Sequence, residues 1–222
     1  NMSMPQNLEQ ARFNMIEQQI RPWDVHAPEI LELLNTLHRE DFVPESQRAI
    51  AFVDMEVPLP GGQVMLAPKY EARVMQELKV QKNEKVLEIG TGSGYMAALL
   101  AHQAQRVVSL EINPELAEFA RGNLQRAGIH NVEVRQADGA LTVQADGPFD
   151  VIVLSGSVAE VPAALLDQLK VGGRLFAIVG DEPVMRAQYI TRSGDKRFET
   201  QSPWDTIAPR LQNFPEPSRF RF

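Results

Sequence analysis

Three acidic residues stand at the ends of short apolar runs and could bind a ligand rich in hydroxyl and amino groups. Glu88 lies two residues ahead of the glycine loop Gly90-Thr91-Gly92-Ser93-Gly94, Glu111 ends the next apolar run, and Asp138 precedes Gly139 after a third. Glycine lets the chain turn sharply and brings backbone N–H groups close to a ligand. A carboxylate about 20 residues after such a loop is typical of a ribose site. We therefore predict an adenosine-type ligand.

The spacing of the glycines separates two cofactors that such a site could bind. The loop follows the pattern G-x-G-x-G, whereas the dinucleotide fingerprint G-x-G-x-x-G accommodates a pyrophosphate. A carboxylate as close as Glu88 would repel a pyrophosphate, but it would attract the cationic ammonium and sulfonium groups of S-adenosylmethionine. We therefore predict S-adenosylmethionine as the cofactor, with a nicotinamide dinucleotide as the less favoured alternative.

The elements that must position these residues alternate along the second part of the chain. Short apolar runs predict strands, and the Ala- and Leu-rich segments between them predict helices. This alternation indicates βαβ units and a parallel sheet with both faces covered. We predict strands at 85–90, 106–111, 132–135, 149–154 and 174–179, helices at 95–103, 114–127 and 162–169, and an antiparallel hairpin of 188–190 with 197–199.

The first part of the chain has a helical pattern and a long connection. Apolar residues recur at helical spacing over 7–39 and again over 68–78, while 42–62 is rich in proline and glycine. The predicted fold is α/β, with a doubly wound, mainly parallel, seven-stranded Rossmann-like sheet, an N-terminal helical cap and a C-terminal antiparallel hairpin. We predict that 1–78 form the cap and the substrate-side connection, and that 79–222 form the cofactor-binding core and tail of the same compact unit.

Composition excludes several classes of protein. The 222 residues include 22 basic and 29 acidic side chains, giving a net charge of −7, and no dense basic block favours a nucleic-acid partner. The absence of cysteine excludes disulfides and thiolate chemistry and favours a cytoplasmic protein. No run approaches the roughly 18 apolar residues of a spanning helix, so no membrane partner is predicted. No metal site is predicted either, because the histidines lack ligand spacing: they are His26, His38, His102 and His130.

Several motifs together resemble one enzyme family. From Arg12 to about Val179 the chain resembles the protein-L-isoaspartate O-methyltransferases, which are class I S-adenosylmethionine-dependent methyltransferases. The matching segments are 15–21, 41–44, 58–63, 86–95, 137–139, 148–150 and 168–175. The resemblance implies methyl transfer to an abnormal aspartyl carboxylate of a damaged protein, with S-adenosylhomocysteine as product.

The resemblance also assigns roles to individual residues. Glu88 and the loop glycines would line the methionine end of the cofactor, Glu111 the ribose, and Asp138 with Gly139 the adenine. The predicted cofactor-binding residues are Glu88, Gly90, Thr91, Gly92, Gly94, Glu111, Ile112, Asp138, Gly139 and Leu154, and the predicted substrate-side residues are Gln63, Pro68 and Lys69.

The chain departs from the family where the acceptor should bind. Leu66 occupies the place of a family serine that is thought to face the reacting carboxylate, and the segments 154–158 and 203–211 also differ. One interpretation is a different, flat or hydrophobic acceptor, such as a small molecule. The other is drift, with Ser155 or Ser157 supplying the missing hydroxyl. A non-catalytic cofactor-binding paralogue is a third hypothesis. The tryptophans are predicted to serve in packing more than in the site: they are Trp23 and Trp204.

Overall fold

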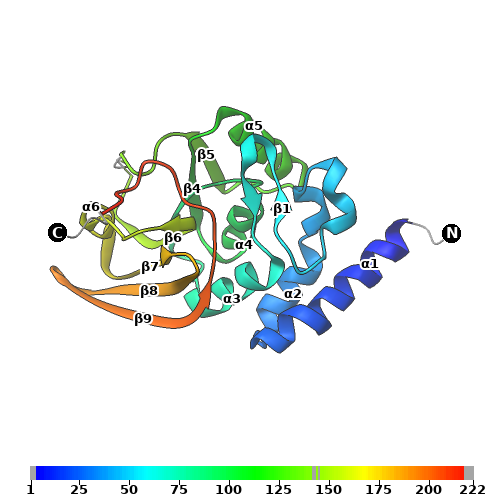
Figure 1. Cartoon of the computed structure of the whole chain (residues 1–222), viewed down its shortest axis with the longest axis horizontal. Coiled ribbons are helices and arrows are strands. Elements are labelled where there is room, and N and C mark those ends of the chain that lie inside the picture. Colours follow the sequence, from blue (N-terminus) through cyan, green and yellow to red (C-terminus); the bar gives the residue numbers. More distant parts are fainter. Residues whose placement is uncertain (1–3, 142–143, 145, 218–222) are drawn as a thin grey trace.

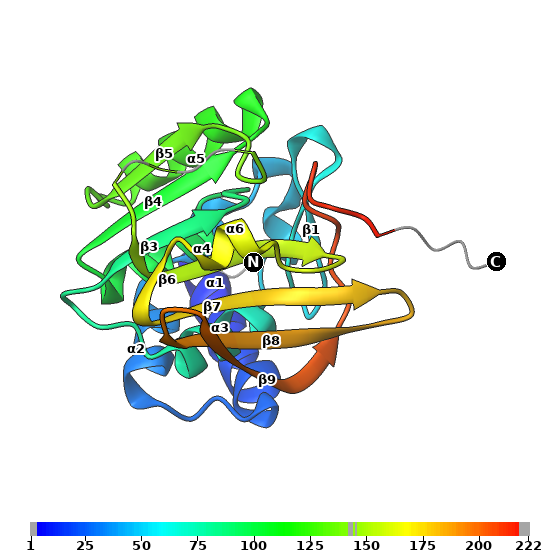
Figure 2. The ribbon, with the colours of Figure 1, turned by 90° about the vertical axis from the view of Figure 1, so that its left-hand side faces the viewer.

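The protein is built around a seven-stranded sheet, described here from a computed structural model (Figure 1). The structure describes residues 4–141, 144 and 146–217. The strand order is β5-β4-β3-β6-β7-β8-β9, which Figure 2 shows from one edge to the other. The strands are β3 (Lys85–Ile89), β4 (Arg106–Glu111), β5 (Val132–Gln136), β6 (Phe149–Val158), β7 (Leu169–Asp181), β8 (Val184–Gly194) and β9 (Arg197–Thr206).

The direction of the strands confirms the predicted fold class. Neighbouring strands from β5 to β7 run parallel, and β7, β8 and β9 pair in antiparallel fashion. The inner strands read as continuous apolar runs because both of their faces are buried. The predicted mainly parallel sheet with a C-terminal antiparallel hairpin is therefore correct.

The two faces of the sheet carry different layers. Val86, Val107 and Val151 pack in one core with residues of α1 to α5. Leu87 and Ile89 point the other way, because side chains alternate along a strand, and they share a second core with α6 and the tail. The helices are α1 (Met4–Met15), α2 (Pro28–Thr36), α3 (Pro68–Leu78), α4 (Tyr95–Gln103), α5 (Pro114–Arg126) and α6 (Ala163–Leu166).

Local sequence explains where α5 begins. Asn113 accepts hydrogen bonds at Oδ1 from the backbone N–H groups of Glu115 at 2.9 Å and Leu116 at 3.3 Å. This side chain satisfies two N–H groups that have no partner within the helix. Pro114, which lacks an N–H, takes the first helical position. The start of α5 is thereby fixed three residues after Glu111.

Several predicted boundaries were wrong, among them those of the strand predicted at 174–179, which runs from Leu169 to Asp181 in β7. The predicted helix 162–169 is shorter because Leu169 already pairs with Phe149 in the sheet. The strand predicted at 149–154 continues to Val158, because Ser157 and Val158 pair with β7. The hairpin strands β8 and β9 are much longer than the predicted ones, since their exposed faces carry polar residues that hide the strand pattern.

The N-terminal part joins the same core. A π-helix (Ile16–Ile20) and short 3₁₀-helices (Arg21–Trp23, Arg39–Phe42, Glu45–Ile50 and Pro60–Gly62) connect α1, α2 and α3, with a small pair of strands β1 (Val57–Pro58) and β2 (Val64–Met65). Residues on both sides of position 78 share one hydrophobic cluster. The division into 1–78 and 79–222 stays a prediction. Within the described residues, no helix is long and apolar enough to cross a membrane.

The chain after β9 returns to the parallel strands. The backbone N–H of Ser157 donates to the carbonyl of Pro209 at 2.7 Å, and that of Leu211 donates to the carbonyl of Ser157 at 2.8 Å. In Figure 2 this segment runs past the end of β6 toward β1. The tail therefore lies across the carboxyl ends of the strands, where the predicted site residues also lie.

Candidate active site

A pocket lies along the carboxyl ends of the parallel strands. Its empty volume is about 1050 Å³, a value that includes the open solvent at its mouth. Sites in open α/β sheets occur at this edge. The predicted residues that line it are Gln63, Leu66, Glu88, Gly90, Thr91, Gly92, Glu111, Ile112, Asp138, Gly139, Leu154 and Ser155.

Glu88 is a fully buried acid in the wall of this pocket. Its Oε1 accepts a hydrogen bond from Ser109 Oγ and its Oε2 one from Ser155 Oγ, both at 2.6 Å. Thr91 Oγ1 lies 2.6 Å from Ser109 Oγ and extends this network. Burial raises the pKa of Glu88 to about 8, although the two serine hydroxyls favour the ionised form. A cation bound beside Glu88 would lower this pKa again.

Glu111 fixes the glycine loop from the next strand. Its carboxylate accepts hydrogen bonds from the backbone N–H of Gly92 at 2.9 Å and of Asn113 at 3.0 Å. Gly90 has a φ of 97°, and a Cβ there would lie 3.0 Å from Leu211 Cδ2 and 3.2 Å from the carbonyl of Ser155. The loop therefore requires glycine at position 90, and its bare backbone faces the pocket.

Four predicted site residues lie outside the pocket lining. Gly94 packs against α5, where a Cβ would come within 3.3 Å of Ala120 Cβ, so it serves the approach of two helices. Ser157 donates its hydroxyl to the carbonyl of Ala208 at 2.8 Å and holds the tail. Pro68 begins α3, and Lys69 pairs with an aspartate on the surface. The predicted roles of Ser157, Gly94, Pro68 and Lys69 in the site stay predictions, because the pocket lining does not include these residues.

Asp138 and Gly139 form the wall at the far end of the pocket. Asp138 accepts a hydrogen bond at Oδ1 from the backbone N–H of Ala140 at 2.9 Å and at Oδ2 from Asn213 Nδ2 at 2.6 Å. A Cβ on Gly139 would lie 2.5 Å from Ile89 Cγ2, so only glycine lets the loop approach β3 this closely. The tail residue Asn213 thus contacts a residue that the sequence assigned to the adenine.

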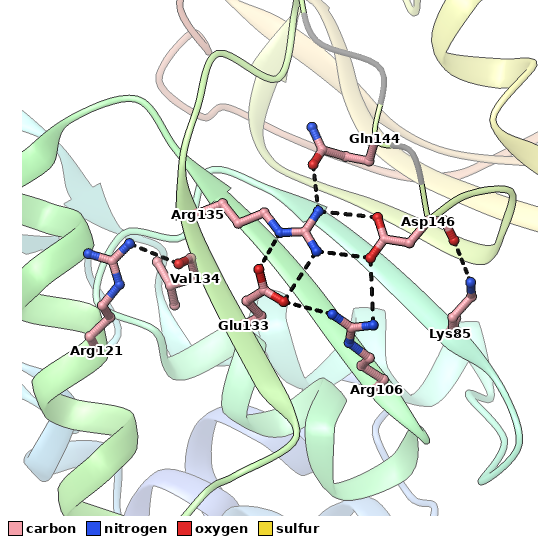
Figure 3. A network of polar contacts seen from close by, with 8 residues as sticks. All are labelled: Lys85, Arg106, Arg121, Glu133, Val134, Arg135, Gln144 and Asp146. Atoms are coloured by element: carbon pink, nitrogen blue, oxygen red, sulfur yellow. Dashed lines mark hydrogen bonds and ion pairs between the residues drawn. The ribbon is translucent and has the colours of Figure 1, made fainter.

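An ion-pair network holds Gln144 and Asp146, which follow Asp138 in the chain (Figure 3). Arg135 of β5 donates to Gln144 Oε1 at 2.7 Å, to Asp146 Oδ2 at 2.9 Å and to Glu133 Oε2 at 2.6 Å. Hydrogen bonds from Arg135 keep the pKa values of Glu133 and Asp146 below their usual range. Lys85 donates to the carbonyl of Asp146. Gln144 and Asp146 are thereby attached to β5, and Asp146 also to β3.

The other end of the pocket is lined by apolar and aromatic side chains. We call Leu66, Tyr70, Phe176 and Trp204 the aromatic wall. Tyr70 and Trp204 are stacked with ring centroids 5.7 Å apart, and Phe176 lies 6.0 Å from Trp204. Trp204 is buried, as its predicted packing role requires, but it also lines the pocket. The second tryptophan, Trp23, packs edge-on against it at 5.4 Å.

Arg39, a buried residue, contacts the backbone and the acid at this end of the pocket. Its guanidinium donates to the backbone carbonyl of Leu66 and to that of Ala51, both at 2.8 Å, and forms an ion pair with Glu71. Glu71 lines the pocket, and burial raises its pKa although the Arg39 charge opposes this. The position of Leu66 is therefore set through its backbone.

Sequence reasoning missed several residues of the site. Ser109 could have been found as a polar residue inside an apolar strand, and Glu71 as an acid beside the apolar stripe of the predicted helix 68–78. The tail residues Leu211 and Phe214 carry no such signal, because only the tertiary fold brings them to the pocket. Across the described residues, no group of three or more His, Asp or Glu side chains could hold a metal ion.

Comparison with known proteins identifies related sequences. The family model described as protein-L-isoaspartate(D-aspartate) O-methyltransferase matches residues 10–207. The chain is 42% identical over 198 residues to protein-L-isoaspartate O-methyltransferase 2 of Marinobacter nauticus, covering 89% of this chain and 90% of the relative. It is also 42% identical over 175 residues to protein-L-isoaspartate O-methyltransferase 1 of Syntrophobacter fumaroxidans, covering 79% and 82%.

Solved structures have the same fold. A Plasmodium falciparum protein described as a protein-L-isoaspartate O-methyltransferase, in complex with S-adenosyl-L-homocysteine, superposes with a TM-score of 0.79 at 19% identity and covers 92% of this chain and 98% of its own. A second protein-L-isoaspartate O-methyltransferase has a TM-score of 0.76 at 26% identity, covering 91% and 65%. The first of these likenesses concerns the fold alone.

Proposed function

The chain belongs to the protein-L-isoaspartate(D-aspartate) O-methyltransferase family, and we propose that it methylates the abnormal carboxylate of isoaspartyl residues in damaged proteins or peptides. One observation carries the proposal. In a chain that matches this family over 10–207, Glu88, Glu111 and Asp138 line a single pocket beside the glycine loop. A cytoplasmic location, which the cysteine-free composition favours, belongs to the same proposal.

The residues present fit S-adenosylmethionine as methyl donor. Glu88 is a buried carboxyl with a raised pKa, which suits a cationic ligand because the cation offsets the cost of ionising it. Glu111 would accept the ribose hydroxyls, and the Gly90 and Gly92 backbone leaves space that side chains would fill. Asp138 would accept the adenine amino group. When bound, S-adenosylmethionine supplies an activated methyl group.

The chain's own residues then have three tasks. Glu88 and Glu111 bind and orient the donor, and the apolar residues around Leu66 exclude water from the acceptor. Alignment and desolvation supply most of the rate in such a displacement. A carboxylate acceptor has an ordinary pKa near 4 and needs no general base at neutral pH. Ser155 is not free to assist, because its hydroxyl donates to Glu88.

The test is methyl-ester formation on a synthetic isoaspartyl peptide with labelled S-adenosylmethionine. A peptide of the same sequence with normal aspartate is the control, and S-adenosylhomocysteine binding by calorimetry shows that the protein is intact. We expect a base-labile ester on the isoaspartyl peptide alone. Transfer to small planar acceptors but to no peptide would favour the acceptor suggested by Leu66. Cofactor binding without transfer to any acceptor would favour the non-catalytic alternative.

A further inference from the structure

The aromatic wall lines the same pocket as Glu88, where the acceptor carboxylate would meet the methyl donor under the proposed function. Glu88 pairs in register with Val153 of β6, and Val153 pairs in register with Phe176 of β7. Residues in register on neighbouring parallel strands point to the same face of the sheet, and the strands are about 4.8 Å apart. Phe176 is therefore displaced by about 10 Å from Glu88 across the sheet. A substrate side chain next to the acceptor carboxylate would have to extend across about this distance to contact the wall.

The wall is held rigidly before any ligand binds. Trp204 Nε1 donates to Glu77 Oε1 at 2.8 Å, and the Tyr189 hydroxyl donates to the same oxygen at 2.5 Å. The guanidinium of Arg73 lies 4.8 Å from the ring centre of Trp23, which packs on both Tyr70 and Trp204. A surface that is already ordered loses little conformational entropy on binding.

The charges of the pocket disfavour an acidic group at this wall. Four carboxyl side chains line the pocket as a whole, and one of them, Glu71, lies at the same end as Leu66. Arg210 is the single cationic side chain of the lining among the described residues. Its guanidinium already donates to the carbonyl of Gly180 at 2.7 Å and to Asp181 and Glu216 at 2.6 and 2.9 Å. No cation of the described lining is therefore available to a second carboxylate.

We propose that the aromatic wall is a specificity subsite that binds an aromatic or large aliphatic side chain adjacent to the isoaspartyl residue and rejects an acidic one. The inference rests on the proposed function and adds the sequence context of its substrate. Burying a large apolar side chain against Tyr70 and Trp204 removes its surface from water, which favours such peptides. An acidic side chain would lose its hydration against this apolar surface. The cations nearby are already paired, Arg39 with Glu71, Lys69 with Asp54 and Arg73 with Glu77.

The experiment compares isoaspartyl peptides that differ at one neighbouring position. Phe, Ser or Glu is placed before the isoaspartyl residue in one set and after it in another, and kcat/KM is measured for ester formation. In at least one set we expect the Phe peptide to exceed the Ser peptide about tenfold, mainly through KM, and the Glu peptide to be the poorest. Equal values in both sets would overturn the subsite and leave the proposed function in place.

Variants connect the preference to the wall. Tyr70→Ala should reduce the Phe-to-Ser ratio to about two, whereas Tyr70→Phe should preserve it, because the ring makes the contact. Phe13→Ala is the matched control, since Phe13 is 57% exposed on α1 and outside the pocket. Unchanged S-adenosylhomocysteine affinity shows that each variant is folded. An unaltered ratio in Tyr70→Ala contradicts the proposal, and binding without ester on any peptide removes the proposed function together with the subsite.

Discussion

The two ends of the pocket are built in different ways. We call the end that contains Glu88, Glu111 and Asp138 the donor end, because we propose that it binds the methyl donor, and the end that contains the aromatic wall the acceptor end. The donor-end residues follow β3, β4 and β5 along one continuous stretch of the chain. The donor end is acidic and internally hydrogen-bonded, with Glu88 and Glu111 as acceptors. The acceptor end combines β2, α3, β7 and β9, and its side chains are mostly apolar.

This difference indicates that donor and acceptor recognition can be changed separately. The donor end serves a single ligand, and its groups hold one another in place through the Glu111 and Asp138 hydrogen bonds. The acceptor end presents mainly apolar and aromatic side chains to the pocket. Variants at the donor end should therefore alter cofactor affinity, and variants at the acceptor end should alter substrate preference.

The largest expected effect is that of Glu111→Ala. It removes the predicted ribose acceptor and two hydrogen bonds, one from the backbone N–H of Gly92 in the glycine loop and one from that of Asn113 before α5. We expect S-adenosylhomocysteine binding to weaken by about 1–3 kcal/mol, the range for hydrogen bonds to charged groups. Titration calorimetry measures this, with Glu118→Ala as control because Glu118 is exposed on α5. An unchanged affinity would exclude Glu111 from the site.

The second effect is a pH dependence carried by Glu88. With a pKa of about 8, this carboxyl is mostly protonated at pH 6 and must ionise to stabilise a cation. The affinity for S-adenosylmethionine relative to S-adenosylhomocysteine, which lacks the sulfonium charge, should rise with pH up to about 8, by at most about 1.4 kcal/mol per pH unit. Glu88→Gln should flatten this ratio. A ratio independent of pH in the unmodified protein would contradict the assignment.

The raised pKa of Glu88 also makes the protein less stable to unfolding as the pH increases. The folded state binds the Glu88 proton more tightly than the unfolded state, where the pKa is about 4.5. The contribution of this group to the free energy of unfolding is therefore full below that value and is lost as the pH rises through about 8. Denaturant unfolding at pH 6 and pH 9 should show a smaller decrease for Glu88→Gln than for the unmodified protein.

The third effect is a change of acceptor preference without a change in donor affinity. Leu66→Ser introduces the hydroxyl that the family resemblance predicts at this position, and one added hydrogen bond is worth about 0.5–1.5 kcal/mol. We expect kcat/KM for a Ser-flanked isoaspartyl peptide to increase about threefold to tenfold. Val171→Ser is the control, because Val171 is exposed on β7. A change in S-adenosylhomocysteine affinity would show that the two ends are coupled.

The smallest effect is that of Asn213→Ala. The change removes one hydrogen bond to Asp138 Oδ2 but leaves the bond from Ala140, so the carboxylate keeps part of its support. S-adenosylhomocysteine affinity should decrease about twofold to fivefold, equivalent to about 0.5–1 kcal/mol. Asn14→Ala on α1 provides the comparison, since Asn14 lies outside the pocket. A loss as large as that of Glu111→Ala would contradict this ranking.

The sequence predicted the donor end better than the acceptor end for a physical reason. Glu88, the glycine loop and Glu111 are linked by short spacings that a strand, turn and helix fix locally. Trp204 reaches the pocket only because β9 pairs with β8, and β8 with β7, over long antiparallel registers. The cofactor role predicted for Gly94 is not distinguished by the sequence from a packing role, because a glycine that admits a ligand and one that admits a neighbouring helix look the same in sequence.

The contact between Arg39 and Leu66 also concerns how this protein can evolve. Arg39 holds position 66 by its backbone carbonyl, which every amino acid possesses. A codon change at this position would therefore alter what the enzyme accepts while the loop keeps its course. Gene duplication followed by such single changes would give paralogues that share one methyl donor and differ in the molecules they modify.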